Sequence, residues 1–198
     1  MHNVTPIIFY FLYFGTSILF VVLLFCFLVS KKFKQFLKPA VYISIAIFLV
    51  SLANQILNLY FAVKGSSFGQ YLLEGMNGFF WQKTIGLSKS YFLSFLFAIS
   101  IFFIAQLVFE KQKRQVLDEY APTIAFVTAL LVGSVQIIPL FVAAFIFAIV
   151  YQLIYLVVKK VSDSRVSIVP FLILAALIIQ VLQIFPFYDK FLGWLHII

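Results

Sequence analysis

The sequence is poor in the residues on which most catalytic and metal chemistry depends. Only 10% of its 198 residues are charged, and it has two histidines and one cysteine. The single cysteine, Cys26, excludes an intrachain disulfide and a cysteine-based metal cluster. Six carboxylates are present, and all of them fall outside the long apolar runs: Glu74, Glu110, Asp118, Glu119, Asp163 and Asp189. Because a proton relay or ion site would need such groups at membrane depth, we predict no enzymatic activity, no metal and no cofactor.

Apolar residues are present in large excess. Hydrophobic residues make up 65% of the chain and aromatic residues 20%, including 27 phenylalanines. Soluble domains contain about 45–50% apolar and about 25% charged residues. This composition excludes a water-soluble globular protein, and it equally excludes a disordered one. The predicted fold class is an all-α integral membrane protein, with residues 1–198 forming one transmembrane helical domain.

Six apolar runs are candidates for transmembrane helices, each of which needs roughly 20 residues to cross about 30 Å of hydrocarbon. The first run is too long for a signal peptide and has no basic segment before it, so we expect it to remain as a span. Residues 121–158 are too many for one span and are divided at Gly133, Ser134 and Pro139. Five of the six prolines lie near the start of a run, where helices tolerate them. The predicted bundle of six transmembrane helices covers residues 6–30, 39–63, 85–109, 121–137, 139–158 and 166–185.

The basic residues predict the orientation of the bundle. Loops 31–38, 110–120 and 159–165 carry ten of the 14 lysines and arginines. With six spans these loops share one side, which is predicted to be cytoplasmic, so that both termini lie outside the cell membrane. The net charge of +8 is then explained by topology and by anionic lipid headgroups at the cytoplasmic face, and no nucleic acid partner is expected.

A polar stripe in the second span is the main candidate for function. Ser51, Asn54, Gln55 and Asn58 are spaced i, i+3, i+4, i+7 and therefore share one helix face, which should point into the bundle. Other spans place polar residues at similar depth, in the outer half of the bundle: Ser90, Ser94, Ser134, Gln136, Gln180 and Gln183. These groups either hold the helices together by hydrogen bonds or line an outward-open cavity. The cavity hypothesis names Asn54, Asn58, Ser94, Gln180, Gln183 and, from the outer loop, Glu74.

Two segments are predicted to lie in the membrane interface. The outer loop 64–84 is the longest connection and holds four of the eight glycines. Its apolar residues recur at helical spacing, which favours a short amphipathic helix or a lid over the cavity. The tail 187–198 is too short to cross the bilayer. Aromatic residues, among them Trp81 and Tyr91, are expected near the outer interface.

No motif in the chain identifies a reaction or a ligand. The first hypothesis is a non-enzymatic, multi-pass membrane protein that binds a small neutral or lipidic ligand in the outer cavity, as a sensor or uptake component. The alternative is an accessory or structural subunit of a larger membrane complex, whose apolar faces other membrane subunits cover. An enzyme acting on lipids is disfavoured, because the polar groups near the interface are too sparse to supply a nucleophile, a base or a metal.

Overall fold

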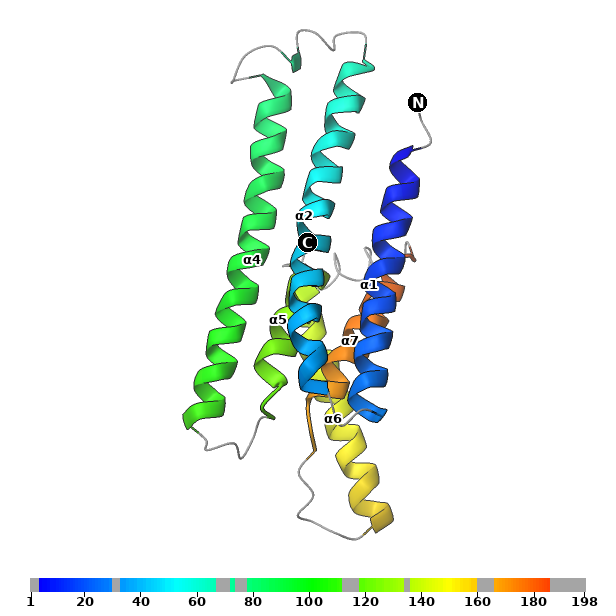
Figure 1. Ribbon diagram of the computed structural model, residues 1–198, viewed down its shortest axis with the longest axis vertical. Coiled ribbons are helices and arrows are strands. Elements are labelled where there is room, and N and C mark those ends of the chain that lie inside the picture. Colours follow the sequence, from blue (N-terminus) through cyan, green and yellow to red (C-terminus); the bar gives the residue numbers. More distant parts are fainter. Residues whose placement is uncertain are drawn as a thin grey trace.

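The computed structural model describes residues 4–29, 33–66, 72–73, 78–111, 118–133, 136–159 and 166–185. Within these ranges all regular secondary structure is helical. Successive helices run in alternating directions along one common axis (Figure 1). They are α1 (Val4–Val29), α2 (Phe33–Lys64), α4 (Phe79–Lys111), α5 (Ala121–Val132), α6 (Ile137–Lys159) and α7 (Val169–Leu182).

Four of these helices are long and apolar enough to cross a membrane: α1, α2, α4 and α6. Their outward surfaces carry large apolar side chains, such as Val157 of α6, which is 78% exposed. An apolar exterior of this kind is suited to lipid and not to water. The chain is thus an all-helical bundle with the build of a membrane protein, as the composition predicts.

The other two helices differ from the expected spans. The sequence predicts full spans over residues 121–137 and 166–185, but α5 has 12 residues and α7 has 14. At 1.5 Å per residue these helices are about 18 Å and about 21 Å long, well short of the hydrocarbon thickness. Six full spans are therefore not established. In Figure 1, α5 and α7 lie beside only one half of α1, α2 and α4.

Local conformation explains why α5 is short. Gly133 ends the helix with φ +89° and ψ 162°, a combination that residues with a side chain rarely adopt. Its N–H donates to the Ala129 carbonyl at 3.2 Å, and its own carbonyl accepts from the Gln136 N–H at 3.1 Å. The chain therefore reverses at this point, and α6 begins at Ile137.

The apolar core lies where α5 and α7 pack against their neighbours. Nine of the 12 residues of α5 are buried, and seven of the 14 residues of α7. Small side chains permit close approach: Ala98 of α4 and Ala129 of α5 are both fully buried in one cluster. Phe20 and Leu23 of α1 complete the core from the other side. The apolar core therefore occupies the half of the bundle that holds α5 and α7.

Helix α2 begins earlier than the sequence predicts. Because helices tolerate proline in the first turn, Pro39 is expected at the start of a span and residues 31–38 in a loop. Instead, α2 starts at Phe33 and contains Pro39 in its second turn. Phe33 and Leu37 are 4% and 7% exposed, so packing against the core stabilises the extra helical residues. Lys34 and Lys38 are consequently helical.

The helix ends that flank the three basic connections lie at the same end of the bundle, which we call the basic end (Figure 1). An ion pair with 2.7 Å between Lys34 Nζ and Glu119 Oε1 joins the start of α2 to the segment before α5 there. At the opposite end α4 begins at Phe79, so part of the expected outer loop is helical. Residues 67–71 and 74–77 of that loop, and the tail 187–198, lie outside the described residues, so their interfacial placement remains a prediction.

Candidate functional site

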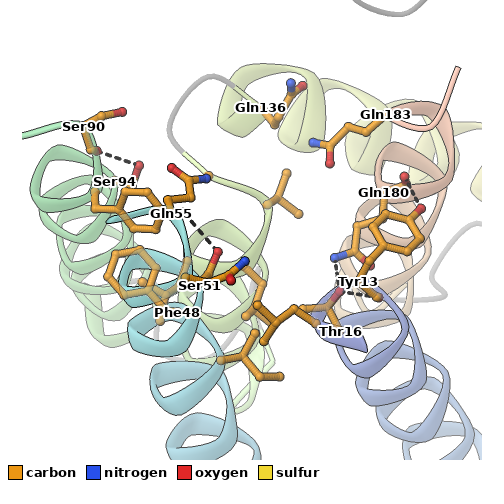
Figure 2. A pocket seen from close by; sticks show the side chains of 18 of the residues that line it. Tyr13, Thr16, Phe48, Ser51, Gln55, Ser90, Ser94, Gln136, Gln180 and Gln183 are labelled. Carbon is orange, nitrogen blue, oxygen red and sulfur yellow. Dashed lines mark hydrogen bonds between the residues drawn. The ribbon is translucent and has the colours of Figure 1, made fainter. Parts of the chain in front are cut away.

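A cavity of about 410 Å³ opens where the short helices end. Its walls come from α1, α2 and α4, and its floor from the last turn of α5, the residue before α6, and the end of α7 (Figure 2). The cavity therefore exists because α5 and α7 stop part of the way along the bundle. We call it the polar cavity, since amide and hydroxyl groups from α1, α2, α4 and α7 line it.

The stripe on α2 forms one wall of the polar cavity. Ser51, Asn54, Gln55 and Asn58 all line it, as their helical spacing predicts. Asn54 is the most enclosed of them, with 6% of its surface exposed, while Gln55 lies at the exposed rim. The stripe thus presents both enclosed and exposed side chains to the cavity.

Asn58 carries the least satisfied polar group of the site. Its side-chain carbonyl oxygen, Oδ1, is buried and accepts no hydrogen bond from any described residue. A buried carbonyl without a partner costs about 1–3 kcal/mol, so native structures seldom keep one without a reason. Because Asn58 lines the cavity, a rotation of its side chain would present this unpaired acceptor to a hydrogen-bond donor on a bound molecule.

Gln180 behaves differently, because its amide is used within the protein. Its Nε2 donates to Thr16 Oγ1 at 2.6 Å, and its Oε1 accepts from Ser17 Oγ at 3.2 Å. Tyr13 also donates its hydroxyl to the Gln180 backbone carbonyl. These bonds join the end of α7 to α1 (Figure 2). Gln180 therefore holds helices together and leaves little for a ligand.

The α4 wall is also satisfied internally. Ser94, which is 6% exposed, donates to the Ser90 carbonyl one turn earlier at 3.0 Å. The hydroxyls of Ser51 and Tyr91 lie 3.0 Å apart and join α2 to α4. The Tyr91 ring packs on Phe48, with 5.2 Å between ring centroids, and gives this wall an aromatic surface. This side of the cavity is therefore largely preformed.

Five of the six predicted site residues meet at the polar cavity: Asn54, Asn58, Ser94, Gln180 and Gln183. Glu74 lies outside the described residues, so its part in the site remains a prediction. The two interpretations of the polar stripe apply to different residues. Gln180 and Ser94 bond within the protein, whereas the Asn58 oxygen lies unpaired in the cavity wall.

Sequence reasoning missed the contributions of Tyr13, Thr16 and Tyr91. Tyr13, Thr16 and Ser17 are spaced i, i+3, i+4 in the first span, and this pattern could have identified a polar face of α1. The sequence places Tyr91 in the aromatic belt, but its hydroxyl bonds inside the cavity wall. A single tyrosine near the end of a predicted span carries no signal that separates these two positions.

None of the described residues that line the polar cavity is charged. The described carboxylates Glu110, Asp118 and Glu119 all lie at the basic end, and no cluster of metal-ligating residues occurs in the described ranges. The site can therefore offer hydrogen bonds and apolar contact. Comparisons with known protein families, with curated proteins and with solved structures gave no match.

Proposed function

We propose that this protein is a multi-pass membrane protein that binds a small uncharged or lipidic molecule in the polar cavity, as a sensor or an uptake component. The observation that carries this proposal is the unpaired, buried Oδ1 of Asn58 in a cavity of about 410 Å³. That volume is within the range of sites that hold small organic molecules. The ligand would have an O–H or N–H donor for Asn58 and an apolar part for Phe48 and Leu131, which also line the cavity.

The orientation is part of the same proposal. The basic end would face the cytoplasm, and the polar cavity would open toward the outside with both termini. The gathering of ten basic residues at three connections supports this direction. A ligand would then reach the cavity from the external medium or from the outer leaflet.

The test is an intact-mass measurement on the full chain extracted from its membrane in a mild detergent. We expect wild-type protein to carry a reproducible small added mass, and Asn58→Leu to have lost it while its helical circular dichroism is unchanged. Gln152→Leu is the matched control, since it removes the same type of amide from an exposed position on α6 that does not line the cavity. A wild-type protein without added mass, or an Asn58→Leu protein that keeps it, would overturn the proposal.

An accessory subunit of a larger membrane complex is the second candidate. The feature that favours it is α6, whose apolar side chains are exposed along most of its length, as at Val142, Ile149 and Val157. Either lipid or a helix of a partner subunit would cover this surface. Bound protein subunits in the same mass measurement would support this candidate.

A further inference from the structure

A second cavity, of about 420 Å³, lies at the basic end of the molecule. One side comes from the first turns of α2 and the other from the start of α5. We call it the basic pocket, and it shares no lining residue with the polar cavity. Its polar lining consists of Lys34, Lys38, Tyr42, Glu119, Tyr120 and Thr123.

The charges of the basic pocket do not cancel. Lys34 and Glu119 neutralise one another, with 2.7 Å between Nζ and Oε1. Lys38 lies one turn further along α2 on the same face and pairs with no carboxylate among the described residues. The described lining of the pocket therefore carries one unit of net positive charge, located at the Lys38 ammonium.

The start of α5 adds to this positive potential. No side chain caps the helix at Tyr120. The Ala121 N–H already donates to the Asp118 carbonyl at 3.0 Å, and Pro122 has no N–H. The first-turn donor left for a ligand is therefore the Thr123 N–H. The N–H groups of a first turn lack acceptors within the helix, and the helix dipole places about half a positive charge there. Thr123, in that first turn, lines the pocket. Lysines and an uncapped helix start together favour an anion.

Apolar side chains form another part of the lining of the basic pocket. Leu37 and Val41 line it, and Tyr42 follows two turns after Lys34 with 73% of its surface exposed. Lysine heads close to a tyrosine and aliphatic side chains are typical of the boundary between headgroups and acyl chains. An anion bound here could therefore keep a hydrocarbon chain against α2.

We propose that the basic pocket binds a phosphate-bearing anion, and that the headgroup of an anionic membrane lipid supplies it. Lys38 and Thr123, in the first turn of α5, hold the phosphate, and Leu37 and Val41 contact the start of an acyl chain. This site is independent of the proposed function of the polar cavity.

The test titrates purified full-length protein in mild detergent with phosphatidylglycerol or with phosphatidylcholine of the same chains, read by native mass spectrometry. We expect tighter retention of phosphatidylglycerol, and a loss of about fivefold in its affinity in Lys38→Gln. Glu119→Gln should raise the affinity severalfold, because it removes the only described negative charge of the lining. Lys38 is exposed, so its substitution leaves the fold intact.

Lys111→Gln is the matched control, because it removes the same charge at the same end but outside the pocket lining. An equal loss of affinity in Lys111→Gln and Lys38→Gln would overturn the proposal, since it would show a diffuse attraction to all basic residues. Soluble glycerol 3-phosphate distinguishes the source of the phosphate. If it displaces the lipid at low millimolar concentration, a free phosphate ester is the occupant and the lipid assignment is wrong.

Discussion

The hydrogen bonds between α1 and α7 allow a quantitative test of how the bundle is held together. Gln180→Leu removes two interhelical side-chain bonds, to Thr16 and from Ser17. Neither hydroxyl is left without a partner, because Thr16 still donates to the Tyr13 carbonyl at 2.8 Å, and the single Ser17 proton, which is shared between Gln180 Oε1 and that carbonyl, keeps the carbonyl at 3.1 Å. At about 0.6 kcal/mol for each bond in a membrane protein, we expect a destabilisation of about 1 kcal/mol.

Thr16→Val should cost more although it removes only one interhelical bond. It leaves the Gln180 amide nitrogen without its acceptor in a residue that is 4% exposed. A buried donor without a partner costs about 1–3 kcal/mol. The double variant should be less destabilised than the sum of the single variants, since it no longer contains the amide that needs the threonine hydroxyl.

The assay is unfolding by increasing SDS in mixed micelles, followed by tryptophan fluorescence and circular dichroism. Thr128→Val is the control, because its hydroxyl is fully buried but donates only within α5, to the Ile124 carbonyl at 2.8 Å and the Ala125 carbonyl at 3.2 Å. We expect it to change stability by less than about 0.5 kcal/mol. Additive effects of Thr16→Val and Gln180→Leu, or an equal cost in Thr128→Val, would refute the assignment of Gln180 as a helix-joining residue.

Two further predictions concern the backbone and the thiol. Gly133→Ala should destabilise the protein by about 1–3 kcal/mol in the same SDS assay, because Gly133 has a positive φ. Gly86→Ala is the control, since an added Cβ would meet no atom within 4 Å at either glycine. Gly86 lies within a helix, so its replacement by alanine should be neutral or stabilising. Equal effects at both glycines would contradict this explanation of the α5 terminus. Cys26, which is 8% exposed, should react with N-ethylmaleimide only after SDS unfolding, while a cysteine introduced at Ser66, which is exposed just beyond the end of α2, should react in the folded protein. Rapid reaction of folded Cys26 would contradict the packing of α1.

The sequence predicted those features that depend on local periodicity. Composition was sufficient for the helical membrane class, and the i, i+3, i+4, i+7 spacing was sufficient to bring Asn54 and Asn58 to one face. The three basic connections were predicted to share one side of the bundle, and the helix ends that flank them do lie together. Each of these inferences uses only residues that are close in the chain.

Features that depend on tertiary packing were not predictable in the same way. The early start of α2 depends on burial of Phe33 and Leu37, which offsets the local signal of Pro39. The ends of α5 and α7 decide whether the polar groups enclose a space, and the end of α5 depends on the backbone conformation of Gly133. Hydropathy alone does not distinguish a buried helix of 12 residues from a full span.

The short α5 and α7 also give the described part of the bundle unequal cross-sectional areas at its two ends. All the described helices share the basic end, but only α1, α2 and α4 continue to the other (Figure 1). Such a wedge displaces more lipid from one leaflet than from the other, so we expect the protein to respond to membrane curvature and lateral pressure. A molecule that enters the polar cavity fills volume on the narrow side of the wedge. If the proposed ligand binds there, we expect its occupancy and the curvature of the surrounding bilayer to affect one another through helix packing.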